Sequence, residues 1–202
     1  MTALGWAMTK ETLLISGVLA AASLLMGACT SRTATDQATV MPSVRNGARA
    51  LTGDDRVLIG LDGDTLGLLR LEAAQWAERL GDEAYYILRE DGTERAFTSE
   101  LLGEKRTGMF VCAGCELPLF SSATKFKSGT GWPSFYEPVR ADHMLELRDE
   151  SYGMVRTEVR CARCDGHQGH VFPDGPPPTG LRYCINGDAL EFVAGAERLP
   201  QP

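Results

Sequence analysis

The 202-residue chain lacks an excess of basic residues, since 27 Asp and Glu outnumber 20 Lys and Arg and give a formal net charge of −7. A basic face is the footprint of nucleic-acid binding, so we expect no nucleic-acid partner. The chain also has no repeat beyond a doubled Cys-x-x-Cys, and no apolar run long enough for a comfortable membrane span. Its 44% hydrophobic and 23% charged composition predicts one globular domain with a tail, which we expect to be a monomer.

Charge is nearly absent from the first 29 residues, which contain only Lys10 and Glu11. The uncharged Leu- and Ala-rich run that follows ends in small residues, as in a targeting segment. Its end, Leu25-Met26-Gly27-Ala28-Cys29, resembles the lipobox of bacterial lipoproteins, with Met26 in place of the usual Leu. We expect a lipoprotein signal peptide over residues 1–28 and a lipid on Cys29 that anchors the protein to a membrane on the extracytoplasmic side of the cell envelope. The alternative is a plain signal peptide with an incidental cysteine.

Residues 29–56 have few large apolar side chains, so they cannot bury enough surface to offset chain entropy. We interpret them as a tether, or simply a passive linker, before a folded domain over residues 57–200. Glycines interrupt residues 57–71, which predicts only short extended pieces there. Apolar residues at helical spacing predict a helix over Glu72–Leu80 and a second short helical stretch over Ala84–Arg89. Beyond Gly92, short apolar runs between Gly- and Pro-bearing turns predict mostly β structure.

Two Cys-x-x-Cys knuckles each offer two thiolates from one tight turn. They are Cys112 with Cys115 and Cys161 with Cys164. Together they supply the tetrahedral set of four cysteines that zinc prefers, and with four protein ligands the metal would have a structural role. Disulfides between the same residues are the alternative in an oxidising compartment.

A further cysteine, Cys184, lies in a stretch whose Tyr and Ile suit a strand. Because side chains alternate along a strand, Arg182, Cys184 and Asn186 are expected on one face, with Tyr183 and Ile185 in the core. A neighbouring guanidinium favours the nucleophilic thiolate. A buried structural cysteine is the alternative, since free cysteines are among the most buried residues.

Two of the three histidines, His167 and His170, directly follow the second knuckle. Since four thiolates complete the metal site, these imidazoles are free to donate protons or hydrogen bonds. Trp132 follows a Gly-rich turn and precedes a proline, so it is either presented to a ligand or buried in the core. The third histidine, His143, is interpreted as ordinary surface.

The paired knuckles and three further segments closely resemble the B-type peptide methionine-(R)-sulfoxide reductases. The segments are Ser128-Gly129-Thr130-Gly131-Trp132-Pro133-Ser134-Phe135, the run from Gly166 to Pro176, and Arg182-Tyr183-Cys184-Ile185-Asn186. The resemblance covers about residues 71–192. It implies a mainly β fold in which two antiparallel sheets form a small β-barrel-like domain with short N-terminal helices and a zinc site of four cysteines.

The same resemblance implies roles for single residues. Cys184 matches the nucleophile that attacks the sulfoxide sulfur and becomes a sulfenic acid, while an imidazolium of His167 or His170 protonates the departing oxygen. The four knuckle cysteines match the zinc ligands. Trp132, His167, His170 and Asn186 match the substrate pocket, with Asp174 and Arg182 in supporting positions. The implied substrate is oxidised methionine of R configuration in proteins or peptides.

The chain lacks one residue that many family members have, because Thr130 occupies the position of their resolving cysteine. An intramolecular disulfide at this place cannot form. We therefore expect a small thiol or a thioredoxin-like partner to reduce the sulfenic acid. Two rival classes are a non-enzymatic zinc-ribbon lipoprotein that binds another envelope protein, and a disulfide-exchange protein that uses one Cys-x-x-Cys.

Overall fold

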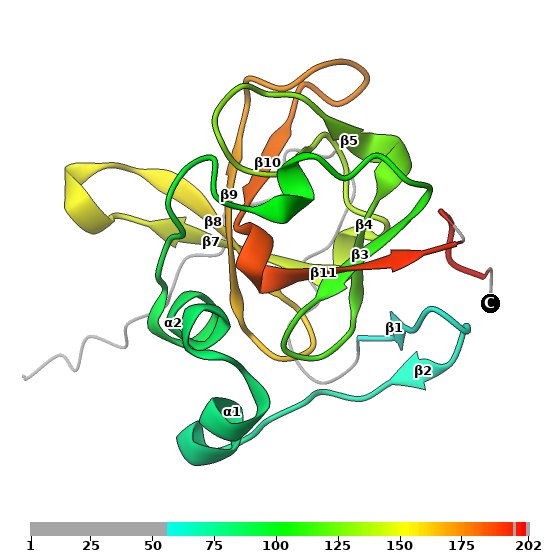
Figure 1. Cartoon of the computed structure of the whole chain (residues 1–202), viewed down its shortest axis with the longest axis vertical. Helices are drawn as coiled ribbons and strands as arrows, with labels where there is room; N and C mark the ends of the chain where they lie inside the picture. The colour runs from blue at the N-terminus through cyan, green and yellow to red at the C-terminus, as the bar shows by residue number, and fades with distance from the viewer. Residues whose placement is uncertain (1–55, 196, 201–202) are drawn as a thin grey trace, which may run out of the picture. The chain divides into compact units, whose positions relative to one another are not determined.

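The computed structural model describes residues 56–195 and 197–200 (Figure 1). The predicted signal peptide, Cys29 and all but the last residue of the predicted tether lie outside these residues. Within the described part of the chain, no helix is both long and apolar enough to cross a membrane.

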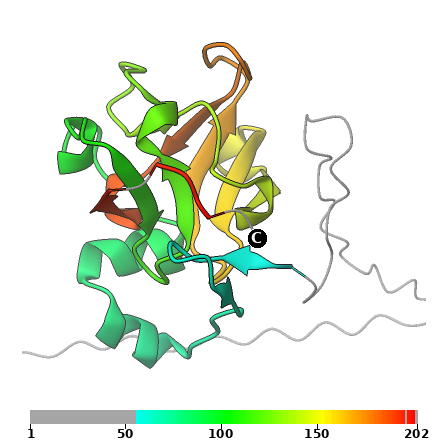
Figure 2. The same cartoon turned by 90° about the vertical axis from the view of Figure 1, so that its right-hand side faces the viewer.

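The described chain begins with a small hairpin and two helices, close to where the sequence predicts them. Strands β1 (Leu58–Ile59) and β2 (Thr65–Leu66) pair antiparallel, and α1 (Ala73–Arg79) and α2 (Asp82–Glu90) follow. The side chains of Glu72 and Gln75 form a capping box at the start of α1, which then buries Trp76. Figure 2 shows both helices together at one end of the two larger sheets, with α2 beside β9.

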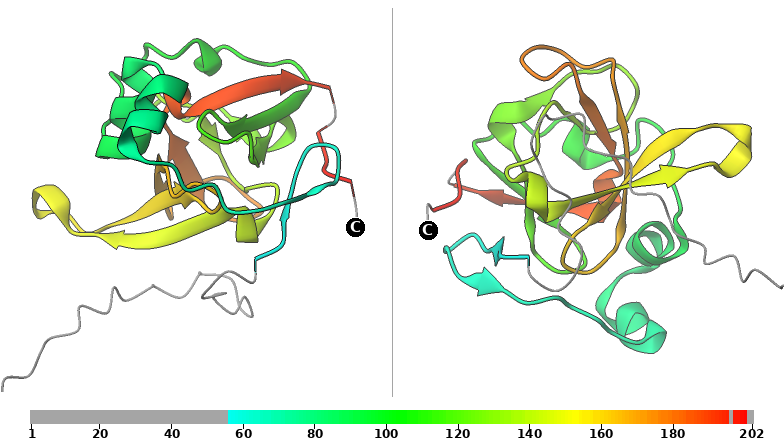
Figure 3. Two further views of the ribbon diagram at one scale, coloured as in Figure 1. Left: turned by 90° about the horizontal axis from the view of Figure 1, so that it is seen from below. Right: turned by 180° about the vertical axis from the view of Figure 1, so that it is seen from behind.

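Two antiparallel sheets make up the rest of the described fold, which confirms the predicted mainly β class. The larger sheet has the order β5-β6-β10-β9-β8-β7, with β5 Lys125–Phe126, β6 Ser134–Phe135, β10 Arg182–Ile185, β9 His167–Phe172, β8 Arg156–Cys161 and β7 Met144–Asp149. The smaller has the order β11-β3-β4, with β11 Leu190–Ala194, β3 Gly108–Cys112 and β4 Pro118–Ser121. The pairings of the described strands leave both sheets open, so they do not close a barrel. Figure 3 shows the β7–β8 hairpin extending away from the other strands.

The core lies between these sheets, where aromatic rings from both meet. Phe135 of β6 stacks on Phe120 of β4 at 4.4 Å between ring centroids and meets Phe110 of β3 edge-on at 4.9 Å. Tyr183 of β10 joins the cluster at 5.7 Å from Phe120. Because Tyr183 is buried in this core, strand alternation turns its neighbour Cys184 to the opposite face of the large sheet.

The interpretation of His143 as a surface residue is wrong, because its side chain has 0% exposure. Its Nδ1 donates to the carbonyl oxygen of Pro118 at 2.6 Å, and its Nε2 accepts from the backbone N–H of Ile59 at 3.1 Å. Burial lowers the pKa of this imidazole. The ring thus connects the N-terminal hairpin to β4. Its two hydrogen-bond partners, Ile59 and Pro118, lie 84 and 25 residues away in sequence, so the polar residues next to His143 give no sign of them.

Candidate active site and metal centre

The four knuckle cysteines come together where the two sheets meet. Cys112 ends β3 of the small sheet and Cys161 ends β8 of the large one. In each knuckle the chain turns back tightly: the N–H of Glu116 donates to Cys112 and that of Asp165 to Cys161, with positive φ at both donors. All four thiols are buried and unpaired, and their sulfur atoms lie within 4.8 Å of one another.

These distances fit a tetrahedral metal ion. Zinc–sulfur bonds of about 2.3 Å place the sulfurs of a regular tetrahedron about 3.8 Å apart. The observed separations are 3.7 Å between Cys112 and Cys164 and 3.4 Å between Cys115 and Cys161. Both far exceed a disulfide bond of about 2.05 Å. Without a metal, burial and the thiols of Cys115 and Cys164 raise the pKa of Cys161 against the opposing effect of Cys112, whereas a bound cation would favour thiolates. The cluster could therefore hold a metal ion.

Arginines surround the cluster and donate to the carbonyl groups of its turns. The Nε of Arg79 donates to Gly114 at 2.7 Å, and Nη1 of Arg89 donates to Cys164 at 2.9 Å. Arg163 donates to the carbonyl of Cys115. Because four thiolates and one Zn²⁺ carry a net charge of −2, these guanidinium groups offset charge where the metal would sit. No sequence pattern marks these arginines, since they come from three separate segments.

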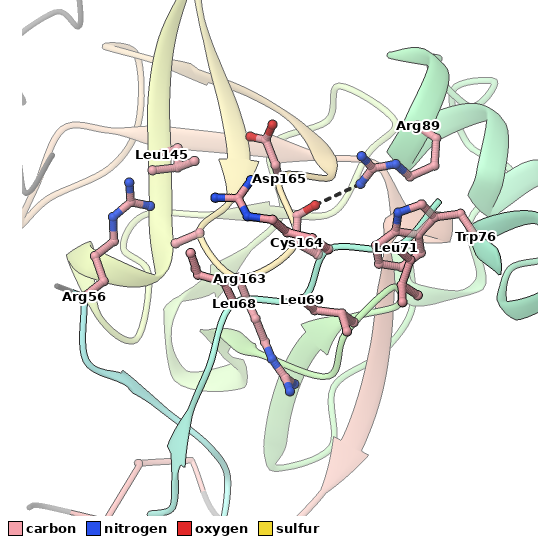
Figure 4. Close-up of a pocket in the computed structure, with 12 residues that line it drawn as sticks. Arg56, Leu68, Leu69, Leu71, Trp76, Arg89, Leu145, Arg163, Cys164 and Asp165 are labelled. Atoms are coloured by element: carbon pink, nitrogen blue, oxygen red, sulfur yellow. Dashed lines mark hydrogen bonds between the residues drawn. The ribbon is translucent and has the colours of Figure 1, made fainter. Parts of the chain in front are cut away.

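A cavity of about 380 Å³ lies beside Cys164 (Figure 4). Its lining is mainly leucine and arginine: Leu68, Leu69, Leu71, Leu145, Arg56, Arg70, Arg89 and Arg163. Of the predicted site residues, Cys164 alone lines it. This cavity therefore belongs to the metal side of the molecule, and the candidate reactive thiol lies elsewhere.

That thiol, Cys184, is half-buried on β10 between two paired strands. Its cross-strand partners are Ser134 of β6 and His170 of β9, and its sulfur lies 3.8 Å from the hydroxyl oxygen of Thr130. Burial raises the pKa of Cys184, although the Thr130 hydroxyl and the charge of Arg182 act in the opposite direction. The expected effect of the guanidinium is present, but desolvation outweighs it, so the resting group is the thiol.

Arg182 shares the exposed face of β10 with Cys184, as the alternation predicts. Its guanidinium makes two hydrogen bonds of 2.9 Å to the carboxylate of Asp174 and lies 4.4 Å from the ring centroid of Phe172. The hydrogen bonds from Arg182 lower the pKa of Asp174. Asp174 therefore fixes the guanidinium two residues from the thiol, while its own negative charge offsets part of the effect of Arg182 on Cys184.

The two histidines face the same side of β9 because the strand is irregular between them. Residues three apart in a regular strand point to opposite faces, but the β8–β9 register shifts here and Gly169 has φ +150°. As a result the rings of His167 and His170 lie 5.5 Å apart, and His170 pairs across the strand with Cys184. A Cβ on Gly169 would collide with the carbonyl oxygen of Cys184, so only glycine fits there.

A carboxylate orients each imidazole. Nδ1 of His167 donates to Glu158 at 2.6 Å and Nε2 of His170 donates to Asp149 at 2.8 Å. Burial lowers the pKa of His170, while the bond to Asp149 partly opposes this effect. Burial also disfavours charge on Asp149, yet hydrogen bonds from Ser151 and His170 and the charge of Arg156 hold its pKa below the usual range. His170 is thus a neutral base held next to a charged carboxylate.

Trp132 and Asn186 are joined through Glu94, a residue that no sequence motif marks. The indole Nε1 of Trp132 donates to the carbonyl of Glu94 at 3.2 Å, and Asn186 Oδ1 accepts from the backbone N–H of Glu94 at 3.2 Å. Asn186 Nδ2 donates to the carbonyl of Gln168 at 3.1 Å. Trp132 remains partly exposed, whereas Asn186 is buried, and its two side-chain bonds link the segment at residue 94 to β9.

Glu94 itself holds the chain just after the thiol. Its buried carboxylate accepts from the N–H of Gly187 at 2.7 Å and from that of Asp188 at 3.0 Å. Burial raises its pKa. Nothing local in the sequence distinguishes this Glu, because its partners lie more than ninety residues away.

Comparison with known proteins gives a consistent family. Residues 80–194 match the SelR domain. The peptide methionine sulfoxide reductase MsrB of Thiobacillus denitrificans is 60% identical over 119 residues, which cover 59% of this chain and 90% of that protein. The corresponding proteins of Agrobacterium fabrum and Caulobacter vibrioides are each 59% identical, over 59% and 66% of this chain and 88% and 80% of their own lengths. The chain therefore belongs to the family of B-type peptide methionine sulfoxide reductases, which are oxidoreductases with a SelR domain.

Proposed function

We propose that the chain reduces the R epimer of methionine sulfoxide in proteins or peptides, with Cys184 as the nucleophile. The observation that carries this proposal is a partly exposed thiol whose cross-strand partner is an imidazole held by a carboxylate. Cys184 would be the nucleophile, His170 the base and Asp149 the group that orients the base, which is the usual arrangement for activating a weak nucleophile. The chirality of the substrate is carried over from the resemblance to the family.

The first step transfers the sulfoxide oxygen to the enzyme. The thiol of Cys184 passes its proton to His170, and the resulting thiolate attacks the substrate sulfur. The imidazolium, stabilised by Asp149, then protonates the oxygen. The attack joins the two sulfur atoms. The protonated oxygen then moves from the substrate sulfur to the Cys184 sulfur as the S–S bond breaks, which leaves a sulfenic acid on Cys184 and releases methionine. Thiol plus sulfoxide thus gives sulfenic acid plus thioether with no external proton. His167, which Glu158 orients, is the second candidate donor.

The other predicted site residues bind the substrate or hold the groups that do. Trp132 presents an apolar surface for the substrate methyl group, while its indole N–H is bonded to Glu94. Arg182, fixed by Asp174, keeps a positive charge near the thiolate as it forms. The side-chain hydrogen bonds of Asn186 go to the backbone, so we assign it to holding this wall of the pocket in place.

The sulfenic acid is reduced by an external thiol. Apart from Cys184, every cysteine in the described residues belongs to the metal cluster, and the residue beside the Cys184 sulfur is Thr130. A small thiol or a thioredoxin-like protein would condense with the sulfenic acid to a mixed disulfide and water. A second thiol would then release the Cys184 thiol and leave the donor as a disulfide.

Zinc bound by the four knuckle cysteines would be structural, since no ligand position remains for water. At the N-terminus we propose a lipid on Cys29 that anchors a monomer to a membrane on the extracytoplasmic side. Cys29→Ser is expected to move the protein from the membrane fraction to the soluble fraction. A variant that stays in the membrane fraction would rule the lipid out.

The decisive experiment assays reduction of N-acetylmethionine sulfoxide, R and S forms separately, by the wild type and by Cys184→Ser. We expect activity on the R form alone, and a fall of kcat by ~10³-fold or more in the variant, because serine lacks a comparable nucleophile. Zinc content, measured in both, should be unchanged. An active Cys184→Ser would remove the proposed nucleophile, and an inactive wild type would favour the zinc-ribbon binding protein.

Mass spectrometry after one turnover of the wild type without reductant tests the second half of the cycle. The expected product is a Cys184 sulfenic acid, trapped by dimedone. A disulfide from Cys184 to another cysteine of the same chain would refute direct external reduction.

A further inference from the structure

Phe97 is an exposed aromatic residue on an unfavourable backbone. Its side chain is 70% exposed, and its φ of +69° is in the left-handed region, which a bulky side chain rarely adopts. Such strain persists only where the surrounding structure enforces it, and it is common at functional sites. Neither the hydrophobic effect nor local preference explains a phenylalanine at this position.

The strained residue is held against the loop that carries Trp132. The backbone N–H of Phe97 donates to the carbonyl of Gly131 at 2.8 Å. Gly131 has φ +98°, and a Cβ built on it would lie 3.0 Å from two ring carbons of Phe97. The ring thus packs directly on Gly131, so its position is fixed although most of its surface faces solvent.

Gly131 connects the two residues of this loop that define the reactive end of the site. Thr130 on one side contacts the sulfur of Cys184, and Trp132 on the other is partly exposed. A second link runs in parallel, because the Trp132 indole donates to Glu94, three residues before Phe97. Phe97 therefore lies at the rim of the site, where it packs on the glycine between Thr130 and Trp132.

We propose that Phe97 is a specificity residue that binds the polypeptide around the oxidised methionine, stacking on apolar side chains or peptide groups that flank it. This inference rests on the proposed function. Trp132 suffices for the small methyl group, whereas a fixed ring outside it offers apolar area only to a ligand that extends beyond the sulfoxide side chain. Free methionine sulfoxide does not extend that far, so Phe97 separates peptide substrates from the free amino acid.

The test compares an oxidised peptide, with methionine sulfoxide flanked by leucine, with N-acetylmethionine-(R)-sulfoxide. Phe97→Ala and Phe97→Gly should each raise KM for the peptide by about 10-fold with little change in kcat, as expected for the loss of uniform binding. KM for the small substrate should stay unchanged. Peptide KM values equal to the wild type would overturn the proposal.

Tyr152 provides a matched control, since it is also aromatic, 91% exposed and at a positive φ of 54°, but in the turn of the β7–β8 hairpin. Tyr152→Gly should leave both KM values unchanged. An equal rise in peptide KM from this variant would mean that any exposed aromatic ring has this effect, and would also overturn the proposal.

Thermal unfolding reports separately on the backbone. At an ordinary exposed position alanine is more stable than glycine, but at a positive φ the order reverses. Phe97→Gly should therefore have a higher Tm than Phe97→Ala while both share the KM defect. Phe97→Ala as stable as or more stable than Phe97→Gly would contradict the strain on which the inference rests. An error in the proposed function would instead be detected by reductase activity in Cys184→Ser. That measurement is independent of the Phe97 variants.

Discussion

At the scale of single residues, the state of Cys184 is decided by a competition between burial and two polar neighbours. Desolvation raises its pKa, and the Thr130 hydroxyl and Arg182 reduce but do not cancel the rise. A thiol that stays protonated in the absence of substrate resists non-specific oxidation, because the thiolate is the reactive species. Burial also lowers the pKa of His170, so in the proposed mechanism this imidazole is neutral before it takes the proton of Cys184.

Thr130 cannot act as a resolving cysteine, but its hydroxyl acts to lower the pKa of Cys184. Its hydroxyl oxygen lies 3.8 Å from the Cys184 sulfur and 2.8 Å from the hydroxyl of Ser128. Of these two hydroxyl groups, that of Thr130 contacts the sulfur. Thr130→Val removes it, so the pKa of Cys184 should rise further. Because the thiolate fraction increases with pH, the iodoacetamide alkylation profile should shift to higher pH.

At a fixed pH of about 8, alkylation of Thr130→Val should be roughly 3- to 10-fold slower than that of the wild type, as expected for one weak hydrogen bond to a charged group. Thr130→Ser keeps the hydroxyl and serves as the matched control, with a profile close to the wild type. A Thr130→Val profile that overlays the wild type would show that the hydroxyl does not stabilise the thiolate.

At the scale of elements, β10 and β9 show why one strand could be predicted and the other could not. Alternation along β10 correctly places Tyr183 in the core and Cys184 on the other face, since the strand is regular. In β9 the same rule would separate His167 from His170, and the register shift that unites them depends on pairing with β8. Regular periodicity is visible in a sequence, whereas a bulge is decided by the neighbouring strand.

The same limit applies to residues whose partners are distant in sequence. His143 looks like a surface residue because its sequence neighbours are polar, yet the fold buries it between the N-terminal hairpin and β4. Glu94 gives no local signal, but it fixes both Asn186 and the turn after Cys184. Cys184 and the four clustered cysteines stand out in the sequence because their side-chain chemistry is rare, while the groups that hold them are common residues.

Gly169 offers a direct test of the β9 irregularity. In Gly169→Ala the new Cβ would collide with the backbone carbonyl of Cys184, so β9 and β10 must separate. We expect a loss of about 3 kcal/mol or more in unfolding free energy, measured by urea denaturation. Gly180→Ala is the matched control: its φ of +70° is also unfavourable, but nothing lies within 4 Å, so it should cost only about 1 kcal/mol. Equal losses in the two variants would show that the close approach to β10 is not the cause.

At the scale of the whole molecule, the four-cysteine cluster joins the two sheets at a point away from the Cys184 thiol. Cys112 and Cys115 belong to the small sheet and its turn, and Cys161 and Cys164 to the large one. The second knuckle leads directly into β9, which carries both histidines. A metal that fixes this knuckle would therefore also fix the register of the strand opposite Cys184.

Removing the metal should consequently loosen the fold and, through β9, the reactive site. We expect one zinc per chain, and a fall in Tm of more than about 10 °C on chelation, because in small metal-bound folds the binding energy is largely folding energy. Cys161→Ser should lack zinc and show the same low Tm, whereas Cys184→Ser should keep both the metal and the Tm of the wild type. Zinc content by atomic absorption, together with calorimetry, measures both quantities. If the chelated protein kept the Tm of the loaded one, the two sheets would be held by their aromatic core alone, and the cluster would have no part in positioning the histidines.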